Sequence, residues 1–165
     1  MGGLFGWDIQ NRKATIYDGG ETEFEATNVR KIGDAVAAVL SQEHEAATAN
    51  QNIYVNSFTL TQNQVLAVLE QVSGQKYEVE KDTTAGLRQR SLERLRTDSN
   101  DFLAFVGTIV ASLYGQGGFN NYSKDVNGGL WNQRLGLTDE SLEDTIRSVL
   151  EQDERGITQG DSGAV

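Results

Sequence analysis

Apolar residues recur at helical spacing in five stretches of this chain. Within each stretch they fall three and four positions apart, which is the period of an amphipathic helix. The predicted helices cover residues 27–40, 61–74, 84–96, 100–114 and 138–150. The pattern therefore predicts a chain that is mainly helical.

Capping residues help to place the ends of these helices. Thr61 and Gln64 form a capping-box pair in front of an apolar run, and Gly74 supplies a stop at its far end. Thr27 and Thr138 stand where the N-terminal caps of two other helices are expected. The boundaries are best defined for the helix over residues 61–74.

Two of the predicted helices carry apolar faces that need a covering neighbour. The helix over residues 100–114 is apolar over more than half of its circumference, so most of its faces should be covered. The helix over residues 27–40 has a narrower face that should pack closely against a neighbour. Its apolar positions are Val29, Ile32, Val36, Val39 and Leu40.

Strand composition is limited to three short stretches, residues 13–18, 52–57 and 76–81. The first of them ends at a Gly-Gly pair, which is a turn signal, and the polar residues 42–51 are predicted to form a loop. A sheet of so few strands leaves edges unpaired unless another segment completes it. The sequence therefore indicates one portion of a larger fold.

The helical period ends near residue 151. We therefore assign residues 1–151 to one folded portion and predict a flexible tail over 152–165. The N-terminus lacks the features of a signal peptide, and the longest apolar stretch, of about 13 residues, is too short to span a bilayer. The expected location is cytoplasmic.

Acidic residues outnumber basic ones by 24 to 14 among 165 residues, which gives a net charge of −10. Such a chain repels phosphate backbones and anionic lipid, so neither nucleic acid nor a membrane is an expected partner. It has no cysteine and a single histidine. This composition excludes disulfides and thiolate metal sites, and we predict no metal site.

The sequence contains no glycine-rich phosphate-binding motif after a predicted strand. Tyr77 and Lys81 have a spacing that many hydride-transfer reductases use on a helix. Here their alternation with Val79 predicts a strand, in which the two side chains would lie about 13 Å apart. We therefore predict neither catalytic nor cofactor-binding residues in this chain.

Two other groups of residues each leave two interpretations open. One basic stretch forms either an exposed helix face laced with ion pairs or a contact for an anion or a partner. A group of aromatic residues forms either core packing or a pocket for a flat, apolar ligand. The basic residues are Arg88, Arg90, Arg94 and Arg96, and the aromatic ones are Phe5, Trp7, Tyr114 and Phe119.

Five segments in a fixed order carry a resemblance to a known family. They are DIQNRKATIYDGG at 8–20, TNVRKIGDAVAAVL at 27–40, IYVNSFTLTQNQ at 53–64, LEQVSG at 69–74, and GQGG at 115–118 followed by LWNQRLGL at 130–137. Together they resemble the C-terminal half of NmrA-like, isoflavone-reductase-like proteins, and within that family the fungal aromatic alcohol reductase (CipA-like) branch. The match runs from about residue 3 to residue 151.

The resemblance implies an α/β fold that forms the C-terminal part of an atypical short-chain dehydrogenase-type Rossmann fold, with its substrate-binding subdomain. The N-terminal nucleotide-binding half, with its glycine motif and catalytic lysine, is expected to be missing. Residues 1–151 would form the substrate-binding portion. Phe5, Trp7, Ile109 and Tyr114 are implied as candidates for the substrate pocket, and no catalytic residue is carried over.

Three interpretations of function follow. In the first, the chain is a truncated NAD(P)H-dependent oxidoreductase whose parent family reduces aromatic or phenylpropanoid-type molecules. NADP(H) would not bind this chain alone, and the chain alone would be inactive. In the second, it is a non-enzymatic NmrA-like regulatory or interaction protein that docks onto a nucleotide-binding half or forms a homo-oligomer. In the third, it is an independent α+β ligand-binding domain.

Overall fold

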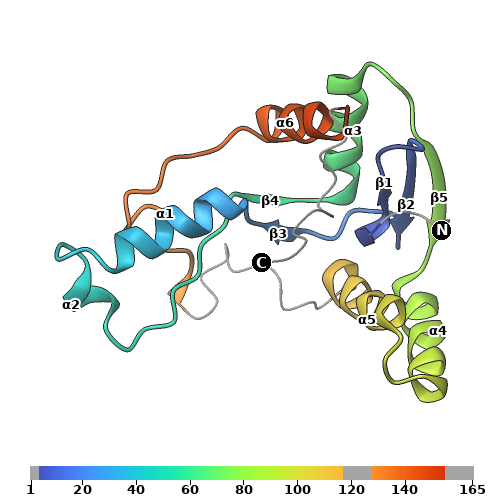
Figure 1. The fold of residues 1–165 in the computed structure, drawn as a ribbon, viewed down its shortest axis with the longest axis horizontal. Helices are drawn as coiled ribbons and strands as arrows, with labels where there is room; N and C mark the ends of the chain where they lie inside the picture. Colours follow the sequence, from blue (N-terminus) through green and yellow to red (C-terminus); the bar gives the residue numbers. More distant parts are fainter. Residues whose placement is uncertain (1–3, 117–127, 155–165) are drawn as a thin grey trace, which may run out of the picture.

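The computed structural model describes residues 4–116 and 128–154, which form an α/β arrangement of two small sheets and six α-helices (Figure 1). In the first sheet, β2 (Lys13–Tyr17) lies between β1 (Trp7–Asp8) and β5 (Glu78–Asp82). β1 runs antiparallel to β2, whereas β5 runs parallel to it, so the sheet is mixed. The predicted strand over 13–18 is confirmed, and the strand predicted over 76–81 is observed two positions later at its start.

The second sheet consists of β3 (Phe24–Ala26) and β4 (Phe58–Leu60), which pair antiparallel. The strand predicted over residues 52–57 is wrong in position, because this segment forms only an isolated parallel bridge between Tyr54 and Leu130. Side-chain amides take part of its backbone pairing instead. The Asn56 N–H donates to Asn132 Oδ1 at 3.2 Å, and Asn132 Nδ2 donates to the Asn56 carbonyl at 2.7 Å.

All five predicted helices are present in the structure. The loop predicted over residues 42–51 contains a further short helix, which the sequence pattern missed. A 3₁₀ turn, η1 (Leu4–Gly6), precedes β1. The α-helices are α1 (Val29–Val39), α2 (Glu45–Thr48), α3 (Gln62–Ser73), α4 (Thr84–Thr97), α5 (Phe102–Tyr114) and α6 (Leu142–Glu154).

The caps of α3 are as predicted. The Thr61 side chain accepts from the Gln64 N–H, the Gln64 side chain accepts from the Thr61 N–H, and Gly74 ends the helix in the left-handed conformation with φ 64°. A left-handed residue at this position favours glycine because it has no side chain to clash with the backbone.

The predicted caps of the first and last helices are wrong. Asn28 occupies the N-cap position of α1, and the Thr27 hydroxyl instead donates to the Val55 carbonyl. At α6 the Ser141 hydroxyl accepts from the Asp144 N–H, so the helix begins later than Thr138 predicts. Ser141 thus takes over the capping role at α6, whereas the Asn28 side chain makes no cap at α1 and donates to Glu140 instead.

The C-terminal boundary is described only in part. α6 continues to Glu154, three positions into the predicted tail. Residues 155–165 lie outside the described residues, as does Phe119. No helix within the described ranges has the length and apolarity that crossing a membrane requires.

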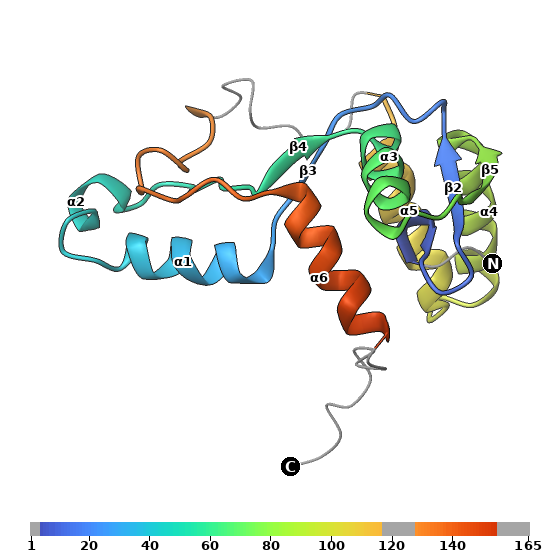
Figure 2. The ribbon, with the colours of Figure 1, turned by 90° about the horizontal axis from the view of Figure 1, so that it is seen from above.

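Two hydrophobic clusters hold the sheets and helices together. One joins both sheets to α5 through Tyr17, Phe24, Leu60 and Tyr114 among others, and the second packs α3 and α6 near β2. Neither cluster contains a residue of α1. Figures 1 and 2 show α1 and α2 at one end of the molecule, away from the three-stranded sheet and the α4–α5 pair at the other end.

Within the described part of the chain no neighbour covers the apolar face of α1, and α5 is covered over only part of its circumference. On α1 the buried residues are Lys31 and Ala35, whereas Val29 is 81% and Leu40 is 79% exposed. On α5 the outer face carries the exposed residues Phe102, Leu103, Phe105 and Ile109. We call the exposed residues Val29, Ile32, Val36 and Leu40 the α1 apolar stripe. On its other side α5 buries Ala104, Val110 and Tyr114, so the expectation is confirmed there and wrong for the exposed residues.

Candidate functional site

Tyr114 lies at the centre of an aromatic cluster between the sheets and the end of α5. Its ring stacks on Tyr17 with a centroid separation of 5.8 Å and meets Phe24 edge-on at 5.0 Å. Its hydroxyl donates to the Phe5 carbonyl at 3.0 Å and accepts from Trp7 Nε1 at 3.4 Å. The cluster thus ties η1 and β1 to the last turn of α5.

A tight backbone turn allows this approach. Gly6 has φ 86°, and a Cβ at this position would lie 2.8 Å from the Thr15 carbonyl oxygen. Glycine is therefore required here both by conformation and by space. The turn brings Phe5, which is 42% exposed, and the half-buried Trp7 next to β2.

A buried glutamine from α3 completes the wall of the cluster. Gln62 is 1% exposed, and its side chain bridges the backbone of β2 by donating to the Thr15 carbonyl at 3.0 Å and accepting from the Tyr17 N–H at 2.9 Å. An amide can satisfy one donor and one acceptor at once, as a neighbouring strand would. Sequence reasoning missed Gln62, and its position at the first residue of a capped helix gave no signal for this role.

The phenols of the cluster are held in their neutral form. Burial raises the pKa of Tyr114 to about 12, although the hydrogen bond from Trp7 opposes this shift. Burial and the charge of Asp82 also raise the pKa of Tyr17. At neutral pH the Tyr114 hydroxyl therefore acts as a hydrogen-bonding partner for Trp7 and Phe5, and neither phenol acts as a proton-transfer group.

The structure brings together three of the four predicted pocket residues. Phe5, Trp7 and Tyr114 meet in the aromatic cluster. Ile109 lies apart from them, on the outer face of α5, where it lines a groove against α4. Tyr114 itself is 2% exposed, so a ligand at this cluster would meet Phe5 and Trp7 first.

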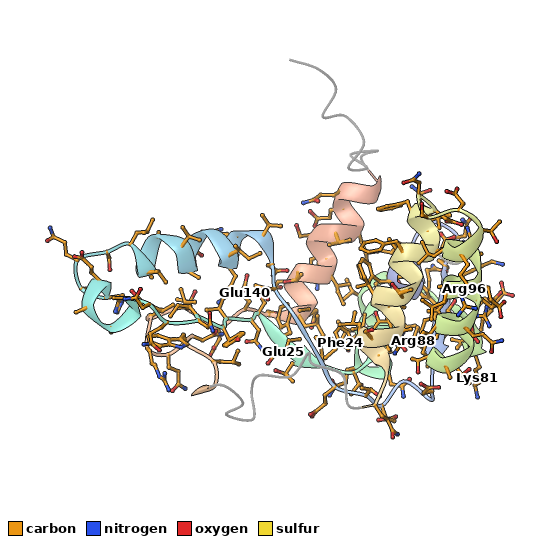
Figure 3. All side chains as sticks on the ribbon, turned by 90° about the horizontal axis from the view of Figure 1, so that it is seen from below. Phe24, Glu25, Lys81, Arg88, Arg96 and Glu140 are labelled. Carbon is orange, nitrogen blue, oxygen red and sulfur yellow. The ribbon has the colours of Figure 1, made fainter. Side chains whose placement is uncertain are left out.

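The groove between α4 and α5 has a volume of about 460 Å³. Its floor and walls are mostly aliphatic, with one guanidinium and two hydroxyl groups. The lining residues are Arg88, Leu92, Leu95, Thr108, Ile109, Ser112 and Leu113. Figure 3 shows Arg88 on α4 where this helix runs beside α5, with Arg96 farther along the same helix.

The basic stretch on α4 separates into paired and unpaired residues. Arg90 binds Asp82, and Arg94 makes two hydrogen bonds to the Asp101 carboxylate at 2.8 and 2.9 Å. Arg88 and Arg96 have no hydrogen-bond or ion-pair partner among residues 4–116 and 128–154. The ion-paired interpretation is therefore confirmed for Arg90 and Arg94, and an anion or partner contact stays a prediction for Arg88 and Arg96.

A polar cluster lies at the start of α1. Lys31 is 3% exposed, and its ammonium group lies 3.5 Å from Glu140 Oε2 and also donates to the Thr138 carbonyl. Burial raises the pKa of Glu140, but hydrogen bonds from Ser57 and Asn28 and the charge of Lys31 outweigh this and hold the pKa below its usual value. Sequence reasoning missed this cluster because Lys31 reads as an exposed helix residue.

The connections from strand to helix do not fit the pyrophosphate of a dinucleotide. They consist of Thr27–Asn28 before α1, Thr61 before α3 and Thr83 before α4, without a glycine. Carboxylates already lie at two of these helix starts, because Asn28 Nδ2 donates to Glu140 and the Thr84 N–H donates to Asp18. A pyrophosphate needs free backbone N–H groups at such a site, and carboxylates there would repel it.

Metal ligands do not gather in the described part of the chain, where no group of three or more histidine, aspartate or glutamate side chains is placed to hold an ion. The chemistry that the described residues offer is therefore of two kinds. The aromatic cluster leaves Phe5 and part of Trp7 exposed to a ligand, and the α4–α5 groove provides an apolar surface with one cation.

Comparison with curated proteins gives matches to two proteins of the same name. The chain is similar to Oxidoreductase poxI of Penicillium oxalicum. The two are 28% identical over 152 residues, which cover 90% of this chain and 46% of the relative. The protein of the same name from Penicillium oxalicum strain 114-2 matches with the same identity and coverage. The chain thus spans about half the length of the curated relatives it matches.

No family model matches the chain, and no solved structure matches it. The mixed sheet and the helices of the described residues are consistent with a Rossmann-like α/β fold.

Proposed function

We propose that this chain supplies the substrate-binding portion of an isoflavone-reductase-like oxidoreductase that reduces aromatic small molecules with NADPH. The observation that carries the proposal is the similarity to Oxidoreductase poxI over 90% of the chain. Since the match covers 46% of that relative, the hydride donor and the catalytic groups are assigned to the remainder of such a protein. The chain alone would then be inactive, because hydride transfer requires both reactants in one site.

The strand-to-helix connections support this division of roles. Their carboxylates and threonines leave no place for a pyrophosphate in the described residues, so the nucleotide would be held by another segment. NADPH, when bound there, would supply the hydride. Residues of this chain would bind and orient the substrate and exclude water from it.

The α1 apolar stripe supports the same arrangement. Its four aliphatic residues lie in a row on an exposed face, and burying such a row contributes about 1.5–3 kcal/mol per side chain. We assign this face to contact with the nucleotide-binding portion, whether that portion belongs to the same polypeptide or to another chain.

The aromatic cluster is the proposed substrate side. The rings of Phe5 and Trp7 would hold a flat aromatic group, and the neutral hydroxyl of Tyr114 keeps both residues in place through its two hydrogen bonds. In this proposal neither Phe5 nor Trp7 transfers a proton. Their role is to position the substrate.

A chimera of Oxidoreductase poxI tests the proposal. It exchanges the matched 152-residue segment for the corresponding residues of this chain, and oxidation of NADPH is followed with a panel of aromatic aldehydes. We expect turnover by the chimera, an increase in KM with little loss of kcat after Trp7→Ala, and no turnover by this chain alone. The matched control is Trp131→Ala, which changes the tryptophan that lies beneath Arg134 and outside the aromatic cluster.

Two results would contradict the proposal. One is a folded chimera that fails to oxidise NADPH with any aldehyde of the panel. The other is an increase in the melting temperature of this chain alone with NADPH, since a ligand at 100 times its dissociation constant stabilises the folded state by about 2.7 kcal/mol. Such an increase would place the nucleotide site within this chain.

The α1 apolar stripe also favours a second candidate function, a non-enzymatic protein that docks onto another chain. In that case the purified chain should form a discrete oligomer through this face. Size-exclusion chromatography of the wild type and of Ile32→Gln/Val36→Gln distinguishes the candidates. A discrete oligomer that becomes a monomer in the variant, together with an inactive chimera, supports the second function.

A further inference from the structure

The groove between α4 and α5 combines an apolar lining with an arginine that has no partner in the described residues. We propose that this groove is a binding site for a small amphipathic carboxylate, whose carboxylate group pairs with Arg88 and whose apolar body lies between the two helices. Nothing in the proposed reductase function requires this site. Binding here needs neither a nucleotide nor a second chain.

The dimensions of the groove suit such a ligand. Its volume of about 460 Å³ lies within the range of roughly 300–1,000 Å³ that is typical of small-molecule sites. Leu92 and Leu95 on α4 face Ile109 and Leu113 on α5 across the groove, so the body of the ligand meets aliphatic side chains on both sides.

Charge decides which end group the ligand carries. The net charge of −10 repels anions from most of the surface, and two neighbouring arginines on α4, Arg90 and Arg94, are already bound to carboxylates. Arg88 lines the groove without such a partner among residues 4–116 and 128–154. A guanidinium offers a planar fork of donors that matches a carboxylate, so charge complementarity selects an anionic ligand.

The hydroxyl groups of the groove leave the recognition of the anion to Arg88. The Thr108 hydroxyl donates to the Phe105 carbonyl at 2.7 Å, and the Ser112 hydroxyl donates to the Thr108 carbonyl at 3.0 Å. With its proton engaged, the Thr108 oxygen acts as an acceptor toward the groove. It would oppose a second carboxylate, so the site fits a ligand with one anionic end.

The test uses 2-naphthoate as the probe and its uncharged analogue 2-naphthamide for comparison. Binding to the whole chain is measured by titration calorimetry, and the site is located from amide chemical shifts in NMR spectra. We expect saturable binding of 2-naphthoate, weaker binding of 2-naphthamide, and the largest shifts in Leu92, Leu95 and Leu113.

Two arginine variants make a matched pair. Arg88→Gln should raise the dissociation constant for 2-naphthoate about tenfold or more, since a charge-assisted pair is lost. Arg96→Gln removes an arginine of the same helix that does not line the groove, and it should leave the constant within about twofold. Neither variant should change the dissociation constant for 2-naphthamide. Far-UV circular dichroism and thermal melts establish that both variants are folded.

A third variant tests the groove independently of Arg88. Leu92→Glu places a carboxylate one helical turn from Arg88, where it pairs with the guanidinium and repels the probe. It should abolish binding of 2-naphthoate, and because Leu92 is 40% exposed, the fold should tolerate the change.

The proposal is overturned if 2-naphthoate does not bind the wild type at about 5 mM, a concentration that detects even weak sites. It is also overturned if Arg88→Gln and Arg96→Gln weaken binding equally, or if the chemical shifts lie outside the groove.

Discussion

A single hydroxyl group holds the N-terminal turn of this protein against the end of α5. The Tyr114 hydroxyl donates to the Phe5 carbonyl and accepts from Trp7, while its ring packs against Tyr17 and Phe24. Packing and hydrogen bonding can therefore be separated by one substitution. Tyr114→Phe keeps the ring and removes both hydrogen bonds.

We expect Tyr114→Phe to reduce the free energy of unfolding at pH 8 by about 1 kcal/mol. The difference from the wild type should narrow as the pH rises from 10 to 12, because the folded protein keeps this phenol neutral with a pKa of about 12. The unfolded chain ionises it near pH 10, so the wild type loses this contribution to stability over that interval.

Thermal melts of the wild type and of Tyr114→Phe between pH 7 and pH 11 measure this effect. The interval from pH 7 to pH 8 is the internal control, since no phenol ionises there and the difference should stay constant. A difference that does not change up to pH 11 would show that the phenol is exposed in solution.

At the scale of helices, α4 and α5 approach closely where one of them has no side chain. A Cβ at Gly107 would lie 2.2 Å from Ser91 Oγ and 3.4 Å from Leu87 Cδ1. Ser91 is 4% exposed, so it has little room to move away. Gly107 thus sets the distance between the helices that form the groove.

Gly107→Ala should therefore destabilise the protein, although alanine gains roughly 1 kcal/mol over glycine within a helix. The cost of overpacking, about 1–3 kcal/mol, outweighs this gain. Adding Ser91→Ala removes the atom in closest contact and should restore most of the loss. Thermal melts of the two single variants and the double variant provide the measurement, and a Gly107→Ala protein as stable as the wild type would contradict it.

Local signals predicted the elements whose ends depend on their own residues. The capping box of Thr61 and Gln64 and the stop at Gly74 are found where the sequence placed them. The strand predicted over residues 52–57 failed because Asn132, 76 positions beyond Asn56, takes up its backbone groups. No local pattern reports on a partner at that distance.

The same limit applies to the candidate site. Aromatic composition and the family resemblance identified Phe5, Trp7 and Tyr114, which the structure brings together. The family resemblance also implied Ile109, but this residue lies on another face of α5, in the groove against α4. The burial of Lys31 beside Glu140 depends on residues more than 100 positions apart, so no local pattern indicates it.

At the scale of the whole molecule, stability should differ between its two ends. Both hydrophobic clusters lie around the sheets, α3, α5 and α6, and neither includes α1. Elements with few buried apolar contacts open more often than the core does. The end that contains α1 and α2 should therefore exchange its amide hydrogens through local opening.

We expect the amides of Ala35–Val39 in α1 to exchange roughly tenfold or more faster than those around Leu69 in α3, which belongs to a cluster. Hydrogen exchange followed by NMR gives both rates in one sample, so α3 serves as the control for α1. In the poxI chimera this difference should become smaller, because the α1 apolar stripe is covered there. Equal rates in the isolated chain would mean that α1 unfolds only together with the core.

The parallel pairing of β2 with β5 also has a consequence for how the chain folds. Lys13 pairs with Glu78, 65 positions further along, and β3, α1, α2, β4 and α3 lie between the two strands. Closing so long a loop lowers the conformational entropy of the chain before the strand hydrogen bonds that offset this loss can form. Contacts between such distant residues therefore slow the folding of a domain. The α4–α5 hairpin needs no such closure and can form first. The sheet then forms late in folding. Until β5 pairs with β2, the edge of β2 opposite β1 remains open to pairing with other chains.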